Sequence, residues 1–262
     1  MNLKNMVLPI AVPLLICSAC TLNTTRGIIT LQVPDFNSLV IGNNMNVNIF
    51  YGPQQIILKG SGNLTSIEYY LKGEELTLIN SGGDKDVIVD IYTHNLANVK
   101  CKENCKVNFP EGFITQSNFL ELTGQNEASI SMHKNVFVDT LCISLNDTSH
   151  LAIDSLFSTS VFCTLHNFTC CNVEGYSNKL FLEMTEAARF NMNFQDNNPK
   201  LSYPLSSSSC IANVKNGAQA WISTIYHLDA TISDDSRIYH YGFPEIIDKT
   251  LENKGDLVPK NV

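Results

Sequence analysis

An eleven-position pattern recurs along the chain, and it constrains the fold more than any other feature of the sequence. In each copy, mostly apolar residues fill positions one, three, nine and eleven, a small residue fills position seven, and polar turn formers fill positions four to six. Copies begin about 20 residues apart, a period expected of a solenoid in which each unit forms one coil. The copies start at Val99, Leu120, Ile143, Cys163, Leu182, Ala212 and Ala230.

The physical meaning of the pattern lies in how its apolar positions can be buried. Alternate side chains of a strand share a face, so positions one and three point to one side, as do nine and eleven. Coils stacked about 4.8 Å apart would fuse these faces into apolar columns that no single coil could bury. We therefore predict an all-β fold, a parallel β-helix or β-solenoid of about 20-residue rungs. An antiparallel β-sandwich is the alternative. In this register the third-position residues Leu122, Leu145, Leu165 and Met184 point into the core.

The polar turns of successive copies form a second predicted column. If the coils stack, Asp147, Asn167, Glu186, Asn216 and Asp234 occupy the same turn position and line up on the surface. Carboxylates in such columns could bind cations or hydrolyse glycosides. Here acids alternate with amides, as turn chemistry alone requires. We predict a surface turn column, with no metal, no cofactor and no catalytic residue.

The first 20 residues read as an export signal. Lys4 precedes an apolar run that is too short to span a bilayer, and the small residues Ser18 and Ala19 precede Cys20. This segment resembles a bacterial lipobox. The resemblance implies that Cys20 is lipidated and that the chain is an exported outer-membrane lipoprotein, attached to the membrane by its lipid anchor. A periplasmic or secreted protein is the alternative.

The remaining chain divides by its pattern of strands and turns. Residues 21–34 form a predicted linker, and residues 35–258 form one domain. Within it, residues 35–98 contain short alternating strands broken by glycine and proline, such as the run that ends at Gly52-Pro53. Residues 99–242 contain the repeated rungs.

Residues 35–258 also resemble a known family. Phe36, Val40, Val47, Ile49, Gly52, Leu71, Gly73 and Leu76 hold the places of its opening strands, and Tyr239, Gly242 and Pro244 resemble its closing strand. The family is the bacterial head GIN domain, also called the auto-transporter adhesin domain. The resemblance implies a mainly β, solenoid-like body, export, and no established activity.

Cysteines and aromatic residues offer further candidate sites. Cys101 and Cys105 flank one turn and point inward in the predicted register, which suggests a local disulfide or two buried thiols. Zinc would require a second cysteine pair with suitable spacing, and the sequence has none. Exposed aromatic residues could contact sugar rings. The candidates are Tyr69, Tyr70, Trp221, Tyr226, Tyr239 and Tyr241, of which Trp221 is predicted to face outward.

Charge and motifs narrow the classes of function. The chain has 25 acidic and 17 basic residues and a formal charge of −8, which argues against nucleic acid as a partner. We expect a non-catalytic, envelope-anchored binding module of adhesin type whose partner is a glycan or a surface protein. One alternative is a polysaccharide-active enzyme that uses acids such as Asp147 and Asp154. The other is a structural envelope lipoprotein without a ligand.

Overall fold

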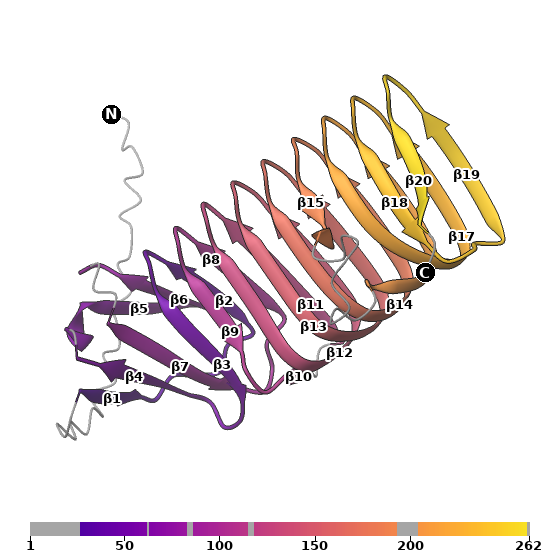
Figure 1. The fold of residues 1–262 in the computed structure, drawn as a ribbon. Coiled ribbons are helices and arrows are strands. Elements are labelled where there is room, and N and C mark those ends of the chain that lie inside the picture. The colour runs from indigo at the N-terminus through magenta and orange to yellow at the C-terminus, as the bar shows by residue number, and fades with distance from the viewer. Residues whose placement is uncertain (1–26, 62, 83–85, 115–117, 193–203, 261–262) are drawn as a thin grey trace, which may run out of the picture.

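The computed structural model describes residues 27–61, 63–82, 86–114, 118–192 and 204–260. Over these residues the chain is an elongated stack of strands, and its only helical element is the 3-10 turn η1 (Leu64–Ser66) (Figure 1). About seven coils follow one another along the body. The predicted all-β solenoid is confirmed, and the antiparallel sandwich is wrong because neighbouring coils pair in parallel.

Short strands make up the N-terminal part, and longer strands make up most of the repeated coils. The N-terminal strands are β1 (Ile28–Leu31), β2 (Ser38–Gly42), β3 (Asn46–Tyr51), β4 (Gln55–Gly60), β5 (Ile67–Lys72), β6 (Glu75–Asn80) and β7 (Val87–Thr93). The first coils contain β8 (Asn98–Lys102), β9 (Lys106–Phe109), β10 (Phe113–Ile114) and β11 (Phe119–Gln125). The later coils contain β12 (Ser129–Leu145), β13 (His150–Leu165), β14 (Cys170–Met184), β15 (Arg189–Phe190), β16 (Ser206–Val214), β17 (Gln219–Ile232), β18 (Arg237–Tyr241), β19 (Ile246–Leu251) and β20 (Asp256–Lys260).

One apolar column shows how the repeat builds the core. Leu145 of β12 pairs with Leu165 of β13, which pairs with Met184 of β14. The column continues through Val214 and Ile232, and all five side chains are fully buried. Parallel pairing holds these residues in register, so each side chain packs against the same position of the coils on either side.

The copy predicted to begin at Leu120 is displaced by two residues. Leu122 is buried as predicted, but it pairs with Val99 and Ile143 and so occupies the first position of its coil. The third position belongs to Gly124, which has no side chain for an apolar pattern to detect. A Cβ at Gly124 would lie 2.9 Å from Cδ2 of Leu145, so the larger neighbouring side chain fills this part of the core.

Two-residue turns with positive φ reverse the chain along one edge of the stack. In each pair both residues have φ between 44° and 75°. The amide of the second residue donates to the carbonyl of the first residue in the next turn, for example Thr148 to Asn167 at 2.9 Å and Phe168 to Glu186 at 3.0 Å. Asparagine, aspartate and glycine tolerate this backbone conformation best, which explains the polar turn residues of the repeat. The nine pairs are Asn43-Asn44, Glu103-Asn104, Asn126-Glu127, Asp147-Thr148, Asn167-Phe168, Glu186-Ala187, Asn216-Gly217, Asp234-Asp235 and Asn253-Lys254.

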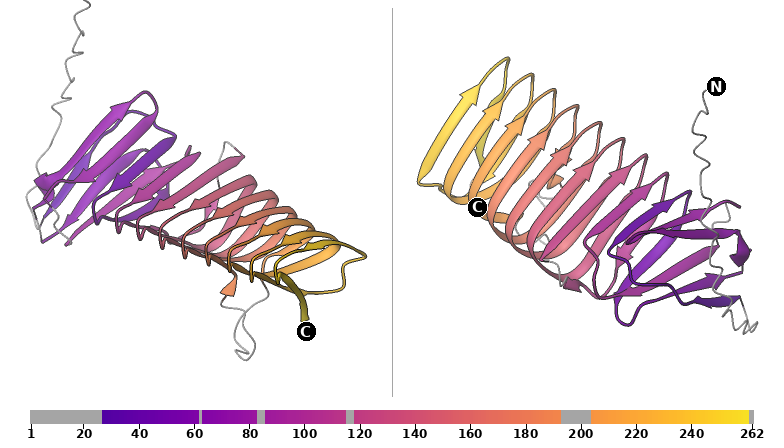
Figure 2. Two further views of the ribbon diagram at one scale, coloured as in Figure 1. Left: turned by 90° about the horizontal axis from the view of Figure 1, so that it is seen from above. Right: turned by 180° about the vertical axis from the view of Figure 1, so that it is seen from behind.

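The N-terminal strands close one end of the stack. β2 and β3 already pair in parallel with β8 and β9, so the first coil lies within residues 35–98. Beyond it, β4 pairs antiparallel with β7 and β1, and β5 pairs antiparallel with β6 (Figure 2). β1 lies within the segment predicted as a linker. Antiparallel pairing therefore ends the parallel ladder here, and the core residues Ile56 and Leu58 are buried.

The opposite end of the stack is open. β19 pairs with β17, and β20 pairs with β18, which leaves their outer edges at the end of the ladder. Ile247 and Leu251 occupy inward positions of β19 yet remain 42% exposed because no further coil among the described residues covers them. Lys249 also occupies an inward position, opposite the buried Ala230. An inward lysine on an edge strand opposes the addition of another strand.

Candidate functional site

The structure brings the predicted turn column together. Asp147, Asn167, Glu186, Asn216 and Asp234 each hold the first place of a two-residue turn in successive coils. Nδ2 of Asn167 donates to Oδ1 of Asp147 at 3.1 Å, and Nδ2 of Asn253 donates to Oδ1 of Asp234 at 3.0 Å. These bonds pair carboxylates with amides from the adjacent coil. Among the residues that the structure describes, no three His, Cys, Asp or Glu side chains gather as a metal site.

Asp147 and Asp154, the acids of the enzyme alternative, lie in different surroundings. Asp147 belongs to the turn before β13, where it accepts the hydrogen bond from Asn167. Asp154 lies within β13, and its Oδ2 is 2.9 Å from Nδ1 of His133 on the adjacent strand. Each carboxylate therefore has its own partner, and this arrangement gives no reason to pair them as an acid and a base.

Cys101 and Cys105 meet inside the turn of the second coil. Both are buried thiols in this structure, and Sγ of Cys101 lies 3.2 Å from the carbonyl oxygen of Cys105. The hydrogen bond between the thiols, together with burial, raises the pKa of Cys101, and the same bond lowers the pKa of Cys105. The disulfide stays a prediction. Cys20, the predicted lipidation site, lies outside the described residues.

A second pair of neighbouring thiols was not predicted from the sequence. Cys163 lies two residues before the end of β13 and Cys171 is the second residue of β14, and their buried side chains contact each other. Burial, followed by this contact, raises the pKa of Cys171. The repeat places both residues at inward positions, and that shared register is the signal that could have found the pair.

The predicted exposed aromatic residues differ in exposure, and Tyr239 and Tyr241 are only partly exposed. Tyr69, Tyr70 and Tyr226 are between 44% and 54% exposed. Trp221 is only 3% exposed and stacks on Tyr239 with ring centroids 4.7 Å apart, so it is not an exposed contact residue.

Two phenylalanines that were not predicted from the sequence form a half-exposed, stacked aromatic pair on the lateral surface. Phe137 and Phe157 occupy paired positions of β12 and β13, with ring centroids 5.2 Å apart and planes 13° from parallel. They are 43% and 45% exposed. Both point outward because Val136 and Leu156, their neighbours, fill the core. Alternation therefore determines their orientation, and parallel stacking determines their spacing.

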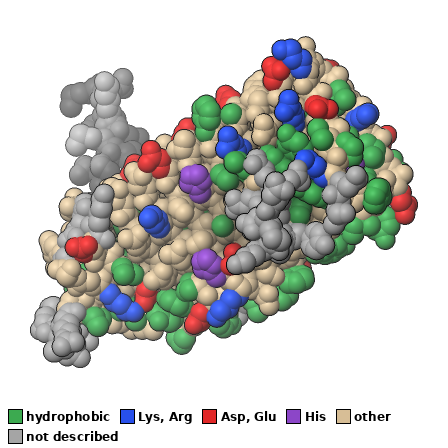
Figure 3. Space-filling model, viewed as in Figure 1, with side chains coloured by type: hydrophobic (Ala, Val, Ile, Leu, Met, Phe, Trp, Pro, Cys, Tyr) green, Lys and Arg blue, Asp and Glu red, His purple; other side chains and the backbone are tan. Residues whose placement is uncertain are grey.

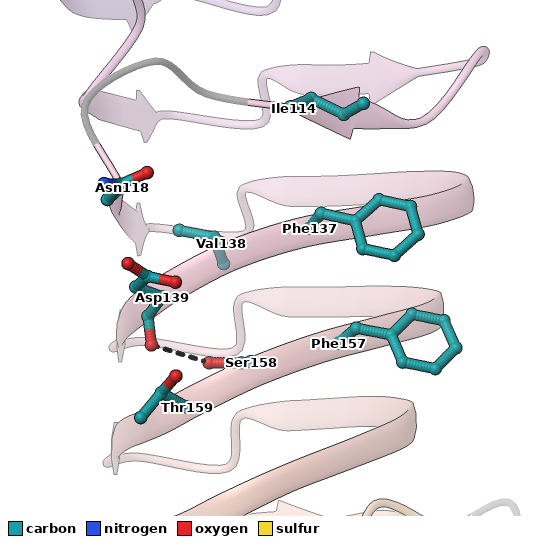
Figure 4. A pocket seen from close by; sticks show the side chains of 8 residues that line it. All are labelled: Ile114, Asn118, Phe137, Val138, Asp139, Phe157, Ser158 and Thr159. Carbon is teal, nitrogen blue, oxygen red and sulfur yellow. Dashed lines mark hydrogen bonds between the residues drawn. The ribbon is translucent and has the colours of Figure 1, made fainter.

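A hollow with a volume of about 330 Å³ lies beside this pair (Figure 4). Figure 4 shows Phe137 and Phe157 at one end, on successive coils with the ring faces visible, and Asp139 and Thr159 at the other end. The hydroxyl of Ser158 donates to the carbonyl of Asp139 at 3.2 Å, which ties the two coils together. We call this site the Phe137 hollow. Its lining residues are Ile114, Asn118, Phe137, Val138, Asp139, Phe157, Ser158 and Thr159.

A second outward aromatic pair lies on another side of the coils. Phe162 and Phe181 stack with centroids 4.6 Å apart, and Ile211 extends the column by one coil. Phe162 is 42% exposed, and Phe181 is less exposed than Phe162. Elsewhere on the surface, Figure 3 shows acidic and basic side chains interspersed among apolar groups on the face in view. No helix of the described residues is long and apolar enough to cross a membrane.

Comparison with solved structures finds bacterial proteins of the same fold. One similar structure is described as "a putative adhesin" from Parabacteroides merdae ATCC 43184, with a TM-score of 0.76, 15% identity, and coverage of 91% of this chain and 97% of that chain. A "putative lipid binding protein" from Parabacteroides distasonis ATCC 8503 has a TM-score of 0.75 and 10% identity, with coverage of 91% and 98%.

A further similar structure comes from Bacteroides fragilis NCTC 9343 and is also described as "a putative adhesin". Its TM-score is 0.62 at 16% identity, and the alignment covers 91% of this chain and 98% of that chain. No family model matches the sequence, and no curated protein matches it significantly. At these identities the likeness establishes a shared fold.

Proposed function

We propose that this chain is a non-catalytic binding module of adhesin type, held on the cell envelope and belonging to the head GIN family. The observation that carries the proposal is the row of half-exposed aromatic side chains on the lateral surface, centred on Phe137 and Phe157. Burying a fully exposed phenylalanine contributes about 1.5–3 kcal/mol, so covering the exposed part of each of these rings provides about 1 kcal/mol of binding energy to a partner.

The shape of the body supports the same role. Stacked coils present identical backbone positions at a regular spacing, and outward side chains therefore form straight rows along the stack. A rigid scaffold of this kind loses little conformational entropy when a partner binds. The similarly folded chains described as putative adhesins agree with this proposal.

The proposed attachment to the envelope rests on the lipobox resemblance at Cys20. A lipidated cysteine would hold the chain at the membrane while the solenoid extends into the surrounding medium. In cells that express the full chain, Cys20→Ser should move the protein from the membrane fraction to the soluble fraction. Equal membrane content in the two strains would contradict the anchor.

An attachment assay tests the binding role. Cells displaying the full chain, and cells expressing the Cys20→Ser chain, are added to wells coated with gastric mucin or with bacterial cell-wall polysaccharide. We expect more attachment by the displaying cells on at least one coating, with the excess removed by added soluble protein. Equal attachment of both strains on every coating would refute the proposed function.

A further inference from the structure

The aromatic pair at the Phe137 hollow belongs to a longer shelf that crosses four coils. Ile114 of β10 pairs with Phe137, Phe137 with Phe157, and Phe157 with Tyr176 of β14. Ile114 is 60% exposed, and the hydroxyl of Tyr176 is held by Oγ of Ser208 at 2.6 Å. Since successive coils lie about 4.8 Å apart, the shelf forms a straight row along the axis of the stack.

Polar groups run beside the shelf at the next outward positions. Asp139 and Thr159 follow Phe137 and Phe157 by two residues in their strands, and both are exposed. Asn118 adds an amide from the preceding coil. The hollow therefore offers an apolar surface on one side, formed by the exposed parts of two rings that stack on each other, and a carboxylate, an amide and a hydroxyl on the other (Figure 4).

This division of apolar and polar groups matches the chemistry of a sugar ring. A pyranose presents an apolar face of C–H bonds, which stacks on aromatic rings, and a rim of hydroxyls, which hydrogen-bond with carboxylates and amides. An acyl chain would leave the Asp139 carboxylate beside hydrocarbon, which is costly. A protein partner would need a buried interface of about 1,200–2,000 Å², far larger than this shallow hollow.

Charge narrows the class of saccharide. Asp139 is the one charged residue among the described residues that line the hollow, and the whole chain has a formal charge of −8. An anionic polymer, such as a uronic-acid glycan, would be repelled by both. Charge therefore argues against an anionic saccharide in this hollow.

We propose that the Phe137 hollow and its shelf bind a neutral polysaccharide strand that runs along the solenoid axis, with sugar rings packed against the exposed parts of Phe137 and Phe157 and hydroxyls bonded to Asp139 and Asn118. This inference rests on the proposed function and assigns a ligand class to it. Each coil contributes one shelf residue, so consecutive sugar units meet consecutive coils.

The test measures retention of the purified full chain, lipid anchor included and in detergent, on beads of cellulose, β-1,3-glucan, mannan or chitin, with polygalacturonate beads as the anionic comparison. We expect retention on at least one neutral polymer and release by the matching soluble hexasaccharide. The double variant Phe137→Ala/Phe157→Ala should bind at least about tenfold more weakly, because two stacking contacts are lost. Phe137→Leu/Phe157→Leu, which keeps apolar bulk but removes the flat rings, should also bind more weakly.

Phe162→Ala is the matched control, because it removes a ring of similar exposure from a different side of the same coils. It should change retention by less than about twofold. Three results would overturn the saccharide site. The first is loss of binding in Phe162→Ala but not in the shelf variants. The others are stronger retention on polygalacturonate than on the neutral polymers, and no retention on any neutral polymer. If cells still attach through the wild-type chain and the shelf variants attach equally well, the binding role stands and the saccharide site fails.

Discussion

Leu165→Ala tests whether the stacked apolar column stabilises the fold as the structure indicates. Leu165 is fully buried between Leu145 and Met184, and parallel pairing on both sides holds the surrounding backbone. The coils cannot move together to fill the space, so the variant should lose transfer free energy and also leave a cavity. Leucine-to-alanine changes at such sites cost about 3–5 kcal/mol.

Leu251 provides a control at the same column position of the last coil. It pairs with Ile232 but is 42% exposed. Leu251→Ala should therefore lose only part of the burial energy, about 1–1.5 kcal/mol, and water would fill the vacated space without a cavity penalty.

Equilibrium unfolding in guanidinium chloride, followed by circular dichroism, measures both variants. Because long repeat arrays can unfold in stages, hydrogen exchange of the β13 amides provides a second, local measure. Equal destabilisation by the two substitutions, or a Leu165→Ala cost below about 1 kcal/mol, would show that the column is not the main support of the stack.

Three further predictions test separate features of the body. Gly124→Ala should destabilise the fold by about 1–3 kcal/mol because its Cβ would contact the Leu145 side chain at 2.9 Å. Gly42→Ala, whose Cβ meets only a flexible side chain at 3.9 Å, should destabilise it much less. Urea denaturation measures both variants, and equal losses of stability would contradict the packing described at Gly124. Lys249→Ile should convert the open end into an adhesive edge and raise the molecular mass measured by light scattering above that of the unchanged chain. Lys254→Ile, in the last turn, should leave that mass unchanged. Burial, and after it the charge of Lys249, lowers the pKa of His240 below its ordinary value of 6.5, so folding favours the neutral imidazole. The contribution of His240 to stability should be complete above about pH 6.5 and should fall as the pH drops towards the lowered pKa. Urea midpoints measured across this range should show the fall in the unchanged chain and not in His240→Gln.

Part of the candidate site could be predicted from the sequence alone. The residues of the turn column were identified because the left-handed turn restricts its occupants to a few residue types, which leaves a visible trace in the repeat. The sequence contains no comparable pattern that would identify Phe137 and Phe157 as an exposed pair. They stand in a row only because Asn135 of β12 pairs with Ser155 of β13 after an irregularity in the ladder, and that register depends on contacts between coils.

The displaced second copy shows the same limit within the core. An apolar pattern cannot detect Gly124, since its place in the column is filled by the side chain of Leu145 from the neighbouring coil. Trp221 illustrates the limit on the surface: alternation predicts its outward direction, but its burial follows from packing such as its stacking on Tyr239.

The sequence by itself determined that the chain forms stacked β coils with polar turns, because period, alternation and turn chemistry are local properties of neighbouring residues. Only the tertiary structure decided where one coil lies against the next, how the N-terminal strands close the stack, and which outward side chains share a row. Those features depend on the register between segments about 20 residues apart, and that register is set by the packing of several coils together.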